Sequence, residues 1–121
     1  MVSFSEDAPI DLPGFRGLMR QAGIEEVVDL TLDIFVGEAP KLFGDLASAA
    51  ETGDLETVRA NAHSLKSSSG NIWANRLSGY FESLESAAAD LDSAVVESVL
   101  AEARPEFDRV ISYIAEVRDG S

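Results

Sequence analysis

The chain has 121 residues and no cysteine, and 45% of its residues are hydrophobic. This composition excludes a disulfide scaffold and a cysteine-bearing zinc site, and it allows one domain with a buried core. Nine basic and 22 acidic residues give a formal net charge of −13, which disfavours binding to nucleic acid or to a membrane surface. The N-terminus has no basic region followed by an apolar run, so we expect no signal peptide and a cytoplasmic location.

The first predicted element is a short helix over about residues 11–22. Asp11 is a suitable N-cap for this helix, and Gly23 is a residue type that commonly follows a helix C-terminus. A second helix is predicted from about residue 25. Its apolar residues recur at helical spacing at Val27, Leu30, Ile34 and Phe35. We expect it to kink or restart near Pro40, because proline removes a backbone donor and clashes with the preceding turn.

Three further helices are predicted in the rest of the chain. The turns that separate them are expected at residues 52–54, 70–75 and 90–92. The last helix should run from about Ser93 to Val117, and Pro105 is expected to kink it.

Long amphipathic helices that are joined by short turns prefer antiparallel neighbours. We therefore predict an all-α fold, an antiparallel up-down four-helix bundle over about residues 25–117 with an additional short N-terminal helix. No repeat or linker divides the sequence, so residues 1–121 are expected to form a single domain.

The only histidine, His63, falls on the predicted helix that follows residue 54. At about 100° per residue, Leu65 and Ile72 lie on the far side of this helix, where the core must be. We therefore expect the imidazole to face solvent.

The residues around His63 on this helix are of two kinds. Ser67, Gly70 and Ala74 lie within about 40° of its direction, so a strip of small side chains is expected beside the ring. Arg59 and Lys66 lie on one flank, about 40–60° away, and bring positive charge to it.

An exposed imidazole with small neighbours and flanking cations suits the transfer of a phosphoryl group. A neutral imidazole nitrogen is a good nucleophile, and Lys66 could neutralise phosphoryl oxygens through charge-assisted hydrogen bonds. Two simpler interpretations compete with this one. His63 could be an ordinary surface residue, and the small strip could be a close contact between helices.

The sequence here resembles a known family. The run Ala62-His63-Ser64-Leu65-Lys66-Ser67-Ser68, followed by Asn71-Ile72 and Arg76-Leu77, is similar to the signature of histidine phosphotransfer (HPt) domains. The resemblance implies that His63 is the phosphoacceptor and that Lys66 stabilises the phosphate. Glu85 resembles a glutamate of the phosphotransfer domain of chemotaxis kinases that hydrogen-bonds the other ring nitrogen. The alternative is that Glu85 is only a solvated helix residue.

The sequence departs from the family pattern at two positions. The glycine that follows the lysine in the family is Ser67 here, which is still small. A second family glycine is replaced by Trp73, which either fills a gap between helices or stands at the rim of the docking surface.

The resemblance implies a phosphoryl carrier and not an enzyme, with no cofactor of its own. Its expected partners are response-regulator receiver domains, which would bring the aspartate and Mg²⁺, and a hybrid or sensor histidine kinase. The receiver is expected to dock on Arg59, Ser67, Gly70, Trp73 and Ala74, and the protein is expected to be a monomer. Two alternatives remain: an HPt-shaped interaction module that transfers no phosphate, or the phosphotransfer domain of a larger chemotaxis-type kinase.

Overall fold

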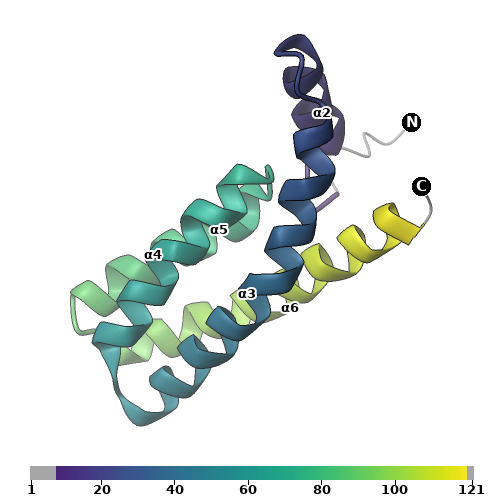
Figure 1. The fold of residues 1–121 in the computed structure, drawn as a ribbon. Helices are drawn as coiled ribbons and strands as arrows, with labels where there is room; N and C mark the ends of the chain where they lie inside the picture. Colours follow the sequence, from purple (N-terminus) through teal and green to yellow (C-terminus); the bar gives the residue numbers. More distant parts are fainter. Residues whose placement is uncertain (1–7, 120–121) are drawn as a thin grey trace, which may run out of the picture.

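The computed structural model describes residues 8–119, and these residues form helices and no strand (Figure 1). The helices are α2 (Leu12–Gln21), α3 (Glu26–Thr52), α4 (Leu55–Asn71), α5 (Asn75–Ala89) and α6 (Ser93–Asp119). Helices α3 to α6 form an antiparallel up-down bundle, to which α2 is added at one end. The predicted all-α fold, with a short additional N-terminal helix, is confirmed.

The helix ends follow the local sequence. The Gly14 N–H donates to the Asp11 carboxylate at 3.2 Å and caps α2. At the next turn, Gly53 ends α3 with a positive φ of 78°, which a residue without a Cβ adopts freely. Asp54 then caps α4, since its carboxylate accepts from the backbone N–H of Thr57 at 3.2 Å and from the Thr57 hydroxyl at 2.6 Å.

The two helical prolines do not divide their helices. α3 continues through Pro40, and α6 continues through Pro105, so of the two outcomes expected at Pro40 a restart is wrong. Both prolines are exposed, and the ribbon of α3 bends along its length (Figure 1). Ala39 and Phe43, on either side of Pro40, are buried, so core packing holds both halves of α3 in one helix.

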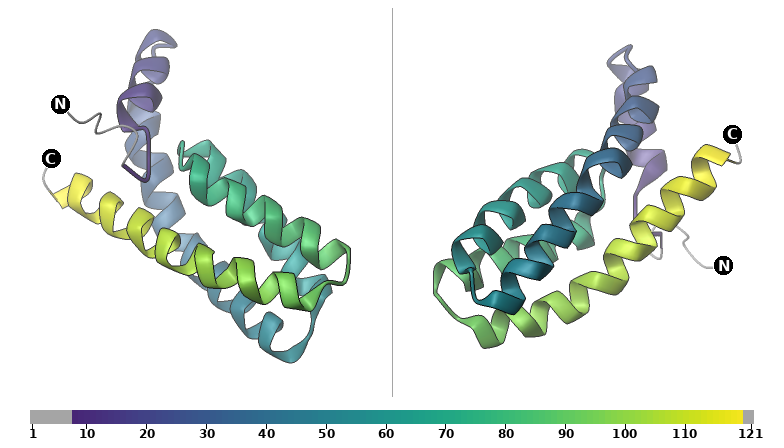
Figure 2. Two further views of the ribbon diagram at one scale, coloured as in Figure 1. Left: turned by 180° about the vertical axis from the view of Figure 1, so that it is seen from behind. Right: turned by 60° about the horizontal axis from the view of Figure 1, so that its bottom comes forward.

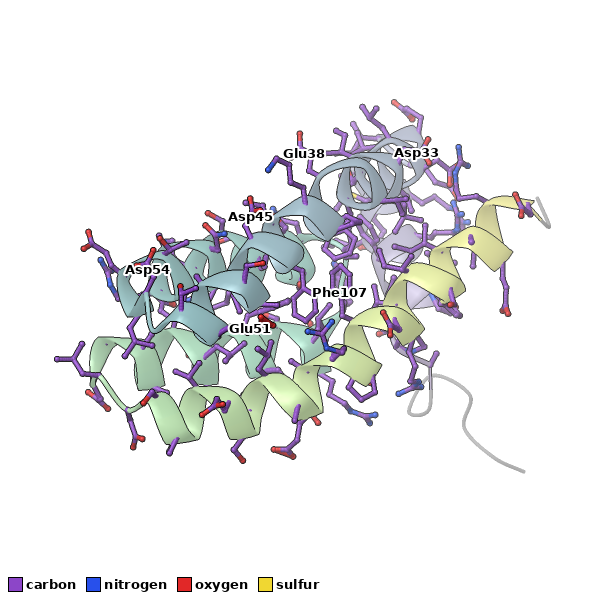
Figure 3. All side chains as sticks on the ribbon, turned by 90° about the horizontal axis from the view of Figure 1, so that it is seen from below. Asp33, Glu38, Asp45, Glu51, Asp54 and Phe107 are labelled. Carbon is purple, nitrogen blue, oxygen red and sulfur yellow. The ribbon has the colours of Figure 1, made fainter. Side chains whose placement is uncertain are left out.

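The core of the bundle contains a cluster of aromatic rings. Phe43 of α3 stacks on Phe107 of α6 with ring centroids 4.5 Å apart, and it forms a T-shaped pair with Phe81 of α5 at a centroid distance of 5.9 Å. Figure 3 shows Phe107 between these helices. α4 contributes the fully buried Val58 and Leu65, so its opposite face is left for solvent.

Helix α2 and the N-terminal half of α3 form an arm that projects beyond the turn between α4 and α5 (Figures 1 and 2). The buried side of this half of α3 runs through Val28 and Leu32, whereas Leu30 and Ile34 are exposed. The apolar spacing therefore predicted the helix, but part of the apolar stripe lies on its outer surface. No helix within residues 8–119 has the length and apolar character that would be needed to cross a membrane.

Candidate phosphoacceptor site

His63 projects from the outer face of α4, and 61% of its side chain is exposed. Its Nδ1 lies 2.8 Å from Oε2 of Glu85, which comes from the neighbouring helix α5. The Glu85 side chain is only 23% exposed, so the contact fixes one edge of the ring against the protein. The expected solvent-facing orientation of His63 is confirmed.

Lys66 completes a three-residue cluster with His63 and Glu85. Its Nζ lies 2.9 Å from Oε1 of Glu85, so the two oxygens of one carboxylate contact a cation and an imidazole. The hydrogen bond from Lys66, and secondly that from His63, lower the pKa of the Glu85 carboxyl, against an opposing effect of burial. Glu85 is therefore ionised at neutral pH.

The ionised Glu85 carboxylate determines which ring nitrogen is free. A carboxylate can only accept hydrogen bonds, so Nδ1 of His63 carries the proton in this contact. In the neutral imidazole, Nε2 then has the available lone pair and lies on the edge of the ring away from Glu85. The site presents one oriented nitrogen nucleophile with an ammonium group close by.

A hydrogen bond joins α4 to α5 beside this site. The Ser78 hydroxyl of α5 donates to the backbone carbonyl of Lys66 at 3.0 Å. A Cβ placed on Gly70 would lie 3.7 Å from Ser78 Oγ, an ordinary contact. Ser67 and Gly70 are both exposed, so this part of the predicted strip is present. Ser78 was missed in the sequence, because nothing in its spacing marks a contact that depends on how two helices pack.

Ala74 does not belong to the exposed strip, and its prediction as a docking residue is wrong. α4 ends at Asn71, so the angle of 100° per residue no longer applies at position 74. Ala74 is fully buried, and its N–H donates to the Ser69 carbonyl at 2.9 Å. It lies directly before α5 at the turn between the two helices.

Trp73 packs inward against α2. Its ring stacks on Phe15 with centroids 6.3 Å apart and an interplanar angle of 14°, and its carbonyl accepts from the Asp11 N–H at 3.2 Å. Gly14 gives the ring space, because a Cβ there would lie 2.9 Å from the indole. Trp73 was expected either to fill a gap between helices or to stand at the rim of the docking surface. Its packing on α2 agrees with the first of these expectations.

Arg59 is exposed on α4, one helical turn before His63. Together with Lys66 it keeps positive charge near the ring in a chain that is otherwise strongly acidic. Within residues 8–119, no three histidine or acidic side chains converge in a way that could hold a metal ion.

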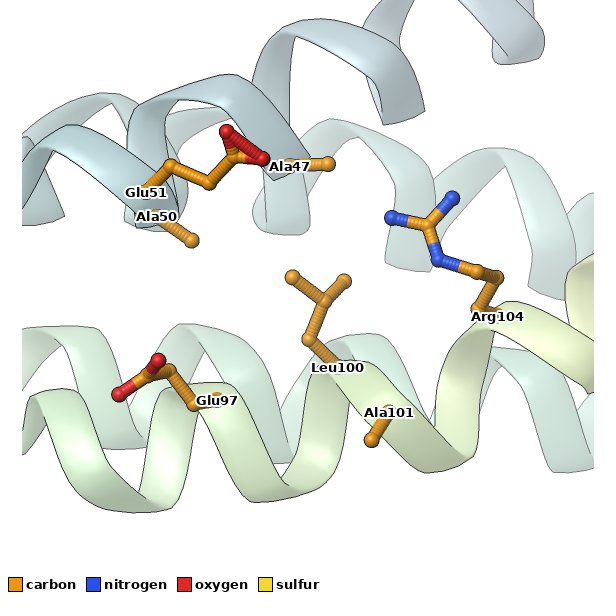
Figure 4. A pocket seen from close by; sticks show the side chains of 7 residues that line it. All are labelled: Ala47, Ala50, Glu51, Glu97, Leu100, Ala101 and Arg104. Carbon is orange, nitrogen blue, oxygen red and sulfur yellow. The ribbon is translucent and has the colours of Figure 1, made fainter.

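A surface cavity lies elsewhere, in a groove between α3 and α6 (Figure 4). It has a volume of about 240 Å³ and is lined by Ala47, Ala50, Glu51, Glu97, Leu100, Ala101 and Arg104. None of these residues belongs to α4 or α5, which carry His63, Lys66 and Glu85. The groove is therefore separate from the exposed cluster on α4 and α5.

Comparison with known proteins gives one structural match and one family match. The chain is similar to the solved structure of histidine-containing phosphotransfer protein B (HptB) from Pseudomonas aeruginosa, with a TM-score of 0.81 and 26% sequence identity. That similarity covers 93% of this chain and 96% of the other. No curated protein sequence gives a significant match. A family model described as Hpt domain matches residues 31–120, so the chain belongs to the Hpt domain family.

Proposed function

We propose that this protein carries a phosphoryl group on His63 between the aspartates of receiver domains in a two-component phosphorelay. The observation that carries the proposal is the exposed imidazole whose Nδ1 is bound by Glu85 at 2.8 Å. Such a contact holds the ring in one orientation and one tautomer, as orienting carboxylates do for other histidines. Membership of the Hpt domain family supports the same role.

The transfer step follows from the free Nε2. Its lone pair attacks the phosphorus of an aspartyl phosphate on the receiver. A nitrogen–phosphorus bond forms while the bond between phosphorus and the aspartate oxygen breaks, and the aspartate leaves as a carboxylate. The ring of His63 becomes cationic and keeps the proton on Nδ1, where the Glu85 carboxylate stabilises it. The reverse sequence passes the phosphoryl group to a second receiver.

Lys66 is proposed to bind the phosphoryl oxygens. Its ammonium group lies beside the ring, fixed by Glu85 at 2.9 Å. An ammonium has three donors, so it can keep the contact with Glu85 while it donates to the phosphoryl group. We propose that Mg²⁺ and the acidic residues that bind it belong to the receiver.

The proposal can be tested by incubating the protein with a receiver phosphorylated on its aspartate and following acid-labile phosphate. We expect label on the wild type and none on His63→Gln. Lys66→Met should transfer at least about tenfold more slowly, the scale of one lost charge-assisted hydrogen bond.

Lys41→Met is the matched control, since Lys41 is exposed on α3 and pairs with Asp45 at 3.0 Å. It changes the net charge equally and should leave transfer unaltered. Label that persists in His63→Gln would contradict the proposed phosphoacceptor. A wild type that stays unlabelled would favour an interaction module without phosphotransfer.

A further inference from the structure

The groove between α3 and α6 opens on the side of the bundle away from the His63 cluster. Within the bundle, α3 packs on α4 and α6, and α5 packs on the same two helices. The edge between α4 and α5 carries His63, Lys66 and Glu85, so the edge between α3 and α6 lies across the core from it. A partner seated in the groove therefore leaves His63 accessible.

The floor of the groove is apolar and is built mostly from small side chains. Ala47 and Ala50 of α3 line it from one side, and Leu100 and Ala101 of α6 line it from the other. Leu100 projects between the two helices (Figure 4). The volume of about 240 Å³ falls below the roughly 300–1,000 Å³ of a typical small-molecule site. It suits a few apolar side chains of a second protein, which can approach closely because alanines line both walls.

Charged side chains of both signs border this floor. Glu51 and Glu97 lie at one end of the groove, and Arg104 lies at the other end (Figure 4). All three are exposed. Within the described part of the chain, neither glutamate forms an ion pair, and the Arg104 guanidinium lies over the Phe43 ring, 5.3 Å from its centroid, without a carboxylate partner. The groove therefore offers two carboxylates and one guanidinium to a partner that complements them.

The spacing of these charges favours a helical partner. Glu97 and Arg104 are seven residues apart on α6, about 10 Å along its axis. On a second helix, two residues seven positions apart have the same separation and point within about 20° of each other. In an extended strand about three residues cover this distance, and an odd number of residues points the two side chains to opposite faces. One face of a helix that lies along the groove therefore meets both charged ends.

We infer that the groove between α3 and α6 binds an amphipathic helix of a partner protein, with a lysine or arginine seven residues from an aspartate or glutamate. The basic residue lies between Glu51 and Glu97, the acidic residue lies at Arg104, and the apolar residues between them cover Leu100. Helices are recognised in such grooves through apolar anchors three, four and seven residues apart. Because exposed acidic residues follow α3 along its length, a helix with a net positive charge is the best match.

Binding is tested with the full-length protein and a fluorescein-labelled synthetic peptide that carries the required face. This matched peptide has a lysine and a glutamate seven positions apart, with leucines between them on the same face. A hydrocarbon staple on the opposite face keeps it helical, since short isolated helices are marginal in water. A shifted peptide has the same staple and composition, but its lysine and glutamate are five positions apart and so about 140° from each other. Fluorescence anisotropy measures the affinity of each peptide.

Three variants of the protein locate the binding site. Glu97→Lys reverses one charge of the groove, and Ala101→Arg fills its floor. Glu102→Lys is the matched control, because Glu102 is exposed on α6 and lies about 140° round the helix from Glu97. All three should keep the helical circular dichroism of the wild type.

We expect the wild type to bind the matched peptide at least about fivefold more tightly than the shifted peptide, the scale of one surface charge pair. Glu97→Lys and Ala101→Arg should each weaken binding of the matched peptide by at least the same factor, and Glu102→Lys by less than twofold. A peptide with glutamate in place of the lysine should bind Glu97→Lys more tightly than it binds the wild type. The imidazole ¹⁵N signals of His63 should not shift when the wild type is saturated with the matched peptide.

Four results would overturn the inference. The first is equal affinity of the wild type for the matched and shifted peptides, and the second is equal affinity of Glu97→Lys and Glu102→Lys for the matched peptide. The third is a shift of the His63 signals, which would place the peptide at the phosphoacceptor. The fourth is a wild-type dimer, detected by sedimentation, that Ala101→Arg dissociates, because a second copy of this chain would then fill the groove.

Discussion

At the scale of single residues, Glu85 has the most consequences because it contacts both His63 and Lys66. Its lowered pKa means that the carboxylate stabilises the folded state at pH values above its ordinary pKa of 4.5. That stabilisation is lost as the pH falls through the lower pKa of the folded state. Acid should therefore weaken the contacts that Glu85 makes between α4 and α5.

Glu85→Gln tests both consequences. Phosphotransfer at neutral pH should fall about tenfold, the lower end of the usual effect of removing an orienting partner. The wild type should be more stable than Glu85→Gln at pH 7, and the difference should shrink below pH 4.5. Urea denaturation across this range measures it, with the exposed Glu82→Gln of α5 as control. A difference that stays constant with pH would show that Glu85 is not held in its charged form.

Trp73 affects stability in two ways, through the stacking of its ring and through the strain of its backbone. It has a φ of 64°, in the left-handed region that costs an L-residue about 1–2 kcal/mol. Trp73→Gly and Trp73→Ala both remove the stack on Phe15, but only glycine relieves the backbone. We expect both variants to be destabilised, Trp73→Gly less so by about 1 kcal/mol, as measured by urea denaturation.

Hydrogen exchange shows where the loss of Trp73 acts. Amides of α2 should exchange faster in both variants, while those of α4 before its last turn should be unchanged. Equal stability of the alanine and glycine variants would contradict a strained Trp73 backbone.

The sequence predicted part of the cluster at this scale. The positions of His63 and Lys66 on one helix followed from their spacing, and the resemblance implied the role of Glu85. Ala74 was misplaced because a constant angle per residue assumes an uninterrupted helix. The left-handed Trp73 was not predicted, because local hydrogen bonds to the Gly70 and Ser69 carbonyls and the distant contacts with Phe15 and Asp11 together hold a non-glycine residue in this conformation.

At the scale of elements, substitution by alanine should have opposite effects on stability at two glycines. One glycine lies at the C-terminal end of α3 and the other lies within it. Gly53 has a φ of 78° at the end of the helix, so Gly53→Ala should lower the free energy of unfolding by about 1 kcal/mol. Gly44 lies within α3, and a Cβ placed on it would meet no neighbouring side chain within 4 Å. Gly44→Ala should therefore raise the free energy of unfolding by about 0.5–1 kcal/mol. Thermal or urea denaturation of the pair measures both, and two shifts of the same sign would contradict the assigned helix end.

The elements themselves were largely predictable. Caps at Asp11 and Asp54 and the glycine at Gly53 indicated limits close to those observed. Pro40 was harder, because the cost of a proline is local whereas the packing of Ala39 and Phe43 that holds α3 together is tertiary.

At the scale of the whole molecule, the net charge of −13 causes repulsion between acidic side chains. Exposed acidic residues follow α3 from end to end, including Asp33, Glu38, Asp45 and Glu51 (Figure 3). Salt shortens the Debye length from about 30 Å at 0.01 M to about 8 Å at 0.15 M, which weakens repulsion across the molecule.

We therefore expect the thermal midpoint of unfolding to rise between these two salt concentrations. Exposed ion pairs such as Arg118–Asp33, at 2.9 Å, are weakened by salt, but each contributes little to stability because solvent screens it. A midpoint that falls with salt would show that such pairs outweigh the general repulsion. Differential scanning calorimetry at constant pH makes the comparison.

The bundle was predictable at this scale because amphipathic helices with short turns allow few arrangements. The arm of α2 and α3 was not. Its position depends on the contact of Trp73 with α2, which has no periodic signal in the sequence.

Phosphorylation of His63 at Nε2 can be observed on the single histidine of the chain. Protein labelled with ¹⁵N in histidine is phosphorylated by a receiver, and the ring nitrogens are observed by NMR. We predict one phosphorus coupling, to Nε2 of His63, while Nδ1 keeps its proton toward Glu85. Phosphate on Nδ1, or phosphate on the protein without any coupling to the ring, would contradict the account.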